Sequence, residues 1–298
     1  MYPALIRAPP LPKYIRERIN TPDEDFLDLD WIKNSNTHLV ILSHGLEGNS
    51  TRQYMAGMAN IFSKNGFDIL AWNYRGCSDE QNCHLYSYHS GFTQDLELVI
   101  KHAVSEGYRR ISLVGFSLGG NMTLKYLGEG STEKFKQIES AVVFSVPIDL
   151  RSCAVQIHKK SNFLYELKFL RSFKQKLFEK AKLFPELDTS FWKNVNSVFD
   201  FDEFFTAPQN GFKSALDYYE KCSAIKFISG IEVPTLVVTA LNDPFLGNEC
   251  LDPTEFKKSR HVYFERPDEG GHVGFAQFGH EGVYWSEKRA LVWVSRHK

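Results

Sequence analysis

The feature that most constrains this chain is a serine between two glycines, where a predicted strand meets a predicted helix. The apolar run Ile111-Ser112-Leu113-Val114 leads directly into Gly115-Phe116-Ser117-Leu118-Gly119, and a helix-forming segment follows over 122–127. The pattern Gly-x-Ser-x-Gly occurs by chance in about one chain in ten of this length. The prediction therefore depends on the strand before the motif and the helix after it. A sharp strand-to-helix turn exposes the serine hydroxyl at the end of the strand. Glycine at both positions removes side chains that would clash in so tight a turn. We predict that Ser117 is a nucleophile.

A serine hydroxyl is a weak nucleophile, so it needs a base and an acid that orients the base. In folds with this turn, the acid and then the histidine follow the serine along the chain. The segment 234–240 reads as a buried strand that ends in a turn at Asp243, and 261–265 reads as the next strand. After it, the glycine-flanked loop 270–274 carries His272. We predict that Ser117, His272 and Asp243 form a catalytic triad.

Other acids and histidines are weaker candidates. Asp149 also follows a predicted strand and is the alternative acid, whereas Asp268 and Glu269 are expected on a solvated loop. His280 is the alternative base. Five further histidines lie within predicted strands or helices and are expected to be structural or surface residues: His38, His102, His158, His261 and His297.

An oxyanion hole is predicted after an early strand. The strand-like segment 38–42 is followed by Ser43-His44-Gly45-Leu46-Glu47-Gly48-Asn49. A His-Gly pair at this place supplies one backbone donor, and the residue after the nucleophile supplies the other. We therefore predict that the N–H groups of Leu46 and Leu118 bind the oxyanion. His44 is expected to brace the loop rather than to transfer protons. Glu47 and Asn49 could line the mouth of the pocket, but we favour a solvated loop for both.

The order of elements predicts an α/β-hydrolase fold. Six strand-like runs alternate with helical patterns, which favours a mostly parallel sheet covered on both faces. They are residues 38–42, 67–73, 111–115, 141–146, 235–240 and 261–265. The alternating segment 26–31 predicts a half-exposed antiparallel strand, and 287–298 predicts a closing helix. We expect the hydrolase core in two parts, 1–150 and 211–298.

The interval between the fourth and fifth predicted parallel strands is too long for an ordinary connection. Residues 151–210 are therefore predicted to form a helical cap insertion over the strand ends. Apolar residues at helical spacing between 163 and 184 indicate an amphipathic helix, or two, and lysines including Lys176 and Lys180 lie on its opposite face. Such a face can meet a lipid surface, but we favour an ordinary cap helix with its basic side in water. The aromatic residues suit the roof of an apolar pocket.

Composition limits the partners and the compartment. The chain has 298 residues, a formal net charge of −1 and five cysteines. This charge gives no reason to expect nucleic acid, and no metal-type cysteine spacing or nucleotide-binding fingerprint is present. We therefore expect no cofactor and no metal. The first 20 residues lack the apolar core of a signal peptide, and no run is long enough to span a bilayer, which predicts a cytoplasmic protein.

Five ordered motifs together resemble the YheT-like branch of the α/β-hydrolases, also called the AB-hydrolase-4 family. They are His-Gly-Leu-Glu-Gly-Asn-Ser (44–50), Asn-Tyr-Arg-Gly-Cys-Ser (73–78), Gly-Phe-Ser-Leu-Gly-Gly-Asn (115–121), Asn-Asp-Pro-Phe (242–245) and Gly-Gly-His-Val-Gly-Phe (270–275). The resemblance implies a serine esterase acting on carboxylic esters of fatty acids, with Ser117, Asp243 and His272 as its triad. Acyl transfer to another alcohol, or thioester hydrolysis, would use the same residues. A binding protein without catalysis is the remaining alternative.

Overall fold

The central element of the computed structural model is an eight-stranded sheet, and the structure describes residues 9–130, 134–277 and 282–297. The strand order is β1-β2-β4-β3-β5-β6-β7-β8. The strands are β1 (Ile15–Asn20), β2 (Phe26–Ile32), β3 (His38–Ser43), β4 (Asp68–Asn73), β5 (Arg110–Phe116), β6 (Ile138–Phe144), β7 (Thr235–Val238) and β8 (Val262–Glu265). From β4 to β8 every pairing is parallel, whereas β2 runs antiparallel to both β1 and β4. Each of the six predicted runs overlaps one of the parallel strands.

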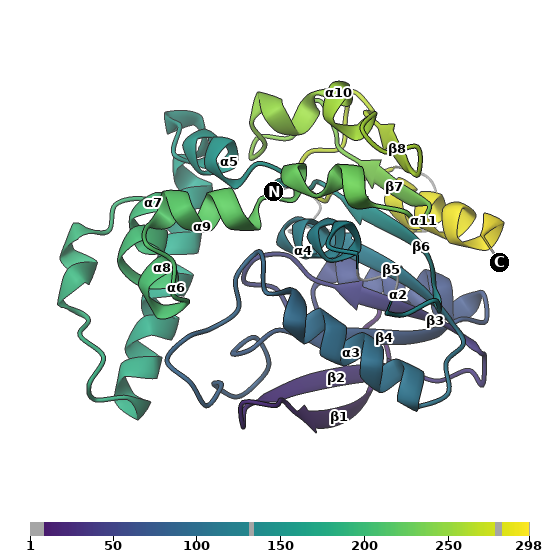
Figure 1. Cartoon of the computed structure of the whole chain (residues 1–298), viewed down its shortest axis with the longest axis horizontal. Helices are drawn as coiled ribbons and strands as arrows, with labels where there is room; N and C mark the ends of the chain where they lie inside the picture. The colour runs from purple at the N-terminus through teal and green to yellow at the C-terminus, as the bar shows by residue number, and fades with distance from the viewer. Residues whose placement is uncertain (1–8, 131–133, 278–281, 298) are drawn as a thin grey trace.

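Helices cover both faces of this sheet (Figure 1). Helices α3 (Thr93–Ser105) and α4 (Leu118–Gly128) pack on one face, and α2 (Gln53–Lys64) and α11 (Trp285–Arg296) pack on the other. The apolar core is correspondingly divided into two layers, one on each side of the sheet. Strands that are buried on both faces read as continuous apolar runs, which is why the sequence pattern identified the parallel strands.

The amino-terminal edge of the sheet differs from the sequence prediction. Strand β2 is antiparallel as predicted, but it is buried rather than half-exposed. The additional strand β1 covers its outer edge, and the acidic residues of β2 pair with arginines of β1. Arg16 contacts Asp30 at 2.9 Å and Arg18 contacts Asp28 at 2.8 Å. Because these carboxylates are paired, their burial does not leave an isolated charge.

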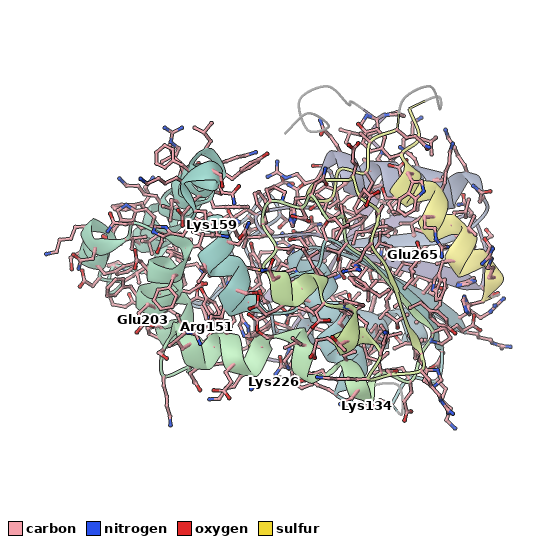
Figure 2. The ribbon with its side chains drawn as sticks, turned by 90° about the horizontal axis from the view of Figure 1, so that it is seen from above. Lys134, Arg151, Lys159, Glu203, Lys226 and Glu265 are labelled. Atoms are coloured by element: carbon pink, nitrogen blue, oxygen red, sulfur yellow. The ribbon has the colours of Figure 1, made fainter. Side chains whose placement is uncertain are left out.

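A helical segment between β6 and β7 lies to one side of the sheet, and we call residues 150–222 the cap segment (Figure 1). Its helices are α5 (Leu150–Ile157), α6 (Phe163–Leu183), α7 (Val198–Phe201), α8 (Ala207–Gln209) and α9 (Ala215–Cys222). A short helix, α10 (Pro253–Phe256), follows β7. Figure 2 shows Arg151, Lys159 and Glu203 on the helical side of the molecule, apart from Glu265 at the end of the sheet. Within the described residues, no helix is long and apolar enough to cross a bilayer.

The long helix of the cap segment corrects two expectations. A single helix, α6, spans the predicted amphipathic stretch, but Phe163 at its start is 60% exposed. Lys180, expected in water, is buried. Its ammonium group donates to the carbonyls of His84, Leu85 and Tyr86 and to the side-chain oxygens of Asn82 and Ser87, at 2.7–3.2 Å. Lys180 therefore ties the cap segment to the loop that follows β4.

Candidate active site

Ser117 occupies a strained turn between β5 and α4. Its φ and ψ are 52° and −119°, a conformation that costs a non-glycine residue free energy and persists only where the surroundings enforce it. A Cβ on Gly115 would lie 2.7 Å from the Gly119 carbonyl oxygen, and a Cβ on Gly119 would lie 2.4 Å from the carbonyl oxygen of His44. Both glycines are thus needed for the close approach of the backbones, as the sequence predicts.

The three residues of the predicted triad lie in one hydrogen-bonded chain. The Nε2 atom of His272 is 2.9 Å from Ser117 Oγ, and its Nδ1 atom is 3.0 Å from Asp243 Oδ2. The Asp243 side chain is fully buried, and the His272 side chain is 16% exposed. The ring of Phe245 lies 4.5 Å from the His272 ring. This order of groups fits proton transfer from the serine to the histidine.

Two residues that the sequence analysis missed hold the loop of His272. The side-chain oxygen of Asn242 accepts hydrogen bonds from the N–H groups of Gly270 and Gly271, at 3.1 and 2.8 Å. The hydroxyl of Ser145 accepts a hydrogen bond from the Val273 N–H at 2.9 Å. Asn242 adjoins Asp243 in the sequence, so one turn positions both the acid and the histidine loop.

The alternative residues are found elsewhere. Asp149 is the N-cap of α5, where its carboxylate accepts a hydrogen bond from the Ser152 N–H at 2.7 Å. Asp268 and Glu269 are exposed, as expected for a solvated loop. His280 lies outside the described residues. The geometry therefore associates Asp243, and not these other acids, with His272.

The predicted oxyanion donors lie on the loop after β3, which carries Leu46, and at the start of α4, which begins with Leu118. The N–H groups on either side of Leu46 are occupied: Gly45 donates to the Tyr54 hydroxyl and Glu47 donates to the Tyr88 hydroxyl, both at 2.9 Å. Leu118 is the first residue of α4, so its N–H has no acceptor within the helix. Leu46 and Leu118 line the same cavity as Ser117. Partial positive charge at the start of α4 also favours an anion there.

His44 braces this loop, as predicted. Its Nδ1 atom is 2.8 Å from the Gly45 carbonyl oxygen, and its Nε2 atom accepts a hydrogen bond from the Tyr74 N–H at 3.2 Å. Burial lowers the pKa of His44 to about 3. The ring is therefore neutral at physiological pH and carries its proton on Nδ1.

Glu47 is not the solvated residue that the sequence suggested. Its side chain is 11% exposed and forms an ion pair with Lys176 of α6, with Nζ 3.0 Å from Oε1. Lys176, which was placed on the water-facing side of the cap helix, is partly buried by the same contact. Charged residues at helical spacing usually indicate a solvated face, and here a loop from the core covers part of it.

A cavity of about 160 Å³ connects Ser117 and His272 to the cap segment. Its lining on the cap side is mainly apolar and includes Leu150, Ile157, Phe169, Phe173, Phe201 and Phe205. This volume is many times that needed for one water molecule, and apolar walls favour the acyl part of an ester over water. The aromatic residues Phe169 and Phe173 thus belong to the pocket roof that the sequence analysis considered.

The described residues contain no group of three or more histidine, cysteine or acidic side chains arranged to hold a metal ion. All five cysteines are free thiols. Cys153 of α5 and Cys250 approach to 3.4 Å between sulfur atoms without forming a disulfide.

Comparison with known proteins identifies the family. A family model described as "Serine aminopeptidase, S33" (Hydrolase_4) matches residues 34–250, which contain Ser117 and Asp243. The Escherichia coli protein named "Putative esterase YheT" is 30% identical over 291 residues, covering 94% of this chain and 84% of that protein. Phospholipase ABHD3 of Bos taurus is 27% identical over 284 residues, covering 91% of this chain and 69% of that protein.

Solved structures show the same fold. The esterase Pf2001 of Pyrococcus furiosus superposes with a TM-score of 0.63 at 19% identity, covering 95% of this chain and 90% of that chain. The two chains thus share the predicted fold class, although their sequences are only 19% identical. The chain therefore belongs to the Hydrolase_4 family of α/β-hydrolases, is similar to the protein named "Putative esterase YheT", and is a carboxylic ester hydrolase.

Proposed function

We propose that this protein hydrolyses carboxylic esters of acyl chains by a serine mechanism in which Ser117, His272 and Asp243 act as the triad. The observation that carries the proposal is the hydrogen-bonded chain from Ser117 Oγ through His272 to Asp243, at 2.9 and 3.0 Å. It lies at a cavity whose cap side is mainly apolar. The relatives named as esterase and phospholipase support the same substrate class.

In the proposed reaction His272 Nε2 accepts the proton of Ser117 as the serine oxygen attacks the ester carbonyl carbon. Asp243 holds the imidazole in orientation and stabilises its positive charge. The N–H groups of Leu46 and Leu118 bind the oxygen that becomes negative, and each such donor is worth about 3–4 kcal/mol of barrier. The alcohol leaves with the proton from His272, and a water molecule then releases the acid by the same steps in reverse.

The acyl chain has one apolar place to lie, under the aromatic side chains of α6 and α7. Phe169 and Phe173 of α6 and Phe201 of α7 line the cavity that Ser117 reaches. We expect the closed end formed by these rings to set the longest acyl chain that the pocket accepts. The proposed substrates are therefore short- or medium-chain acyl esters or lipid-like esters.

The test is hydrolysis of a p-nitrophenyl ester series from acetate to palmitate by the wild type and by Ser117→Ala. We expect the substitution to lower kcat/KM at least about a thousandfold while leaving the free energy of unfolding within about 1 kcal/mol. Labelling by a fluorophosphonate probe should disappear with it. Equal hydrolysis by both proteins, or labelling at a residue other than Ser117, would contradict the proposal.

A further inference from the structure

The residue that follows the proposed oxyanion donor Leu46 is held in an unusual conformation by contacts from both parts of the molecule. Glu47 has a φ of 55°, which is unfavourable for a residue with a side chain. Its neighbours His44 and Gly45 bond only to residues of the core, Tyr74 and Tyr54 among them. The cap segment reaches this loop through polar contacts at Glu47 and through apolar packing at Leu46.

Three groups hydrogen-bond to the Glu47 carboxylate. The Tyr88 hydroxyl donates to Oε1 at 2.9 Å while accepting the Glu47 N–H at the same distance. From helix α6, Lys176 donates to Oε1 at 3.0 Å and the Ser172 hydroxyl donates to Oε2. The backbone carbonyl of Glu47 accepts a further bond from Arg52 at 2.7 Å. The conformation of the loop is therefore fixed partly by where α6 lies.

The charge of this cluster also matters for the proposed chemistry. Glu47 and Lys176 line the same cavity as Ser117, and the reaction places a negative charge at the oxyanion site. An unpaired carboxylate near that site would repel the developing charge, and this repulsion is strong where water is excluded. Lys176 pairs with Glu47 at 3.0 Å, so the carboxylate that follows Leu46 does not act as an unpaired negative charge.

We propose that Glu47 and Lys176 form a positioning pair that couples the seating of the cap segment to the oxyanion site at Leu46. When α6 is in place, Lys176 and Ser172 hold the Glu47 side chain. Glu47 then fixes the peptide between Leu46 and Glu47, and this limits how the preceding peptide, which carries the Leu46 N–H, can rotate. When α6 moves away, the loop loses two bonds and an uncompensated carboxylate remains beside the site. This inference rests on the proposed serine mechanism and adds a cap-dependent step to it.

The pair predicts an unusual pattern of mutant activities. Lys176→Met leaves Glu47 without its counter-ion, so we expect kcat to fall about tenfold with KM changed less than about twofold. In the double variant Glu47→Gln with Lys176→Met the unpaired charge is gone, and kcat should recover to within about threefold of the wild type. Ser172→Ala removes one bond and no charge, and should lower kcat about twofold.

The experiment measures kcat and KM on the best p-nitrophenyl ester, and the rate at which a fluorophosphonate labels Ser117, for these variants. The control is Lys182→Met, which removes an exposed lysine of the same helix and should match the wild type. The thermal midpoint of each variant shows whether it is folded. If Lys176→Met does not fold, Ser172→Ala still tests the contact between α6 and Glu47.

Two results would overturn the inference. The first is a double variant less active than Lys176→Met alone, which would mean that the pair contributes only packing. The second is Lys176→Met with wild-type kcat and labelling rate. If the wild type itself is not labelled at Ser117, the serine mechanism fails, and the inference fails with it. If the wild type, Lys176→Met and the double variant are all labelled strongly and at the same rate, the serine mechanism stands and only the inference about the Glu47–Lys176 pair fails.

Discussion

The core and the cap segment are built differently, although both contribute to the same cavity. In the core, side chains of the proposed triad stand at the ends of β5 and β7 and on the loop after β8, where backbone contacts leave little freedom. In the cap segment, a separate apolar cluster that includes Phe173, Leu177 and Phe201 forms the pocket roof. It contacts the core through polar groups, among them Lys176 and Lys180, and through apolar side chains, among them Leu46 and Phe245.

This difference between the core and the cap segment indicates that catalysis and substrate selectivity depend on separate regions of the molecule. The backbones of β5, α4 and the loop after β3 approach closely beside Ser117. We therefore expect small changes in nearby side chains to leave the geometry of Ser117 unchanged. A cluster of side chains on a helix, by contrast, can change its volume without moving the triad. We therefore expect changes in the core to abolish activity and changes in the cap segment to alter which esters are hydrolysed.

The largest effect is expected for Gly119→Ala in the core. The new Cβ would lie 2.4 Å from the His44 carbonyl oxygen and 2.5 Å from that of Ser43, and backbone atoms cannot yield as a flexible side chain does. We expect the free energy of unfolding to fall by about 4 kcal/mol or more, and hydrolysis to be lost because Ser117 and Leu118 move. Urea unfolding and the ester assay measure both effects.

The matched variant in the cap segment is Gly211→Ala. Gly211 has a φ of +74°, and no atom lies within 4 Å of the position of its added Cβ. Only the backbone conformation is then penalised, by about 1 kcal/mol, and esterase activity should stay near the wild-type value. If Gly119→Ala cost no more than Gly211→Ala, the close backbone approach at Ser117 would not be the constraint described here.

A smaller effect is expected for Phe173→Ala in the roof of the pocket. The Phe173 ring is 6% exposed and stacks on Phe201 at 4.5 Å. Its loss should lower the free energy of unfolding by about 3 kcal/mol and shift the preferred ester towards longer acyl chains, with hydrolysis of short esters retained. The measurements are urea unfolding and kcat/KM across the ester series.

The control for that variant is Phe178→Ala, on the same helix but 42% exposed. It should change stability by no more than about 0.5 kcal/mol and leave the chain-length preference unchanged. A Phe173→Ala protein that kept the wild-type preference, or lost all hydrolysis, would mean that the cap segment does not set selectivity separately from the core.

The same contrast explains which parts could be predicted from sequence. The parallel strands are buried on both faces, so each appears as an apolar run, and glycine at 115 and 119 marked the turn at Ser117. Strand β1 was missed because its alternating charges are matched by Asp28 and Asp30 of a neighbouring strand. A one-dimensional pattern does not show such pairing.

Charged residues of the cap helix were misassigned for a related reason. The bond between Lys176 and Glu47 joins residues 129 positions apart, and the oxygens around Lys180 are mostly backbone carbonyls of one loop. Helical spacing says that both lysines share a face, but not that a loop of the core covers it. Asn242 and Ser145 were likewise missed, since a single polar residue after a strand carries no signal of its bonding partner.

A smaller effect than that of Phe173→Ala is expected for His89, at the boundary between the two parts. Its ring packs edge-on against Phe92 of the core and against Phe212 and Tyr218 of the cap segment, at 5.1–5.5 Å between ring centroids. Burial lowers the pKa of His89 to about 3 from its ordinary value of 6.5. Between these two pH values the unfolded chain binds a proton that the folded chain does not, so stability falls as the pH is lowered.

At pH 5 this one residue should cost about 2 kcal/mol relative to pH 8. In His89→Phe the titrating group is absent, and the fall in the free energy of unfolding between pH 8 and pH 5 should be smaller by that amount. The variant also loses the acceptor of the Gly91 N–H, which lowers stability at every pH and so does not affect the difference. Urea unfolding at the two pH values measures it. An equal fall in both proteins would show that His89 becomes protonated without unfolding, and that the boundary between core and cap segment admits water more readily than either part alone.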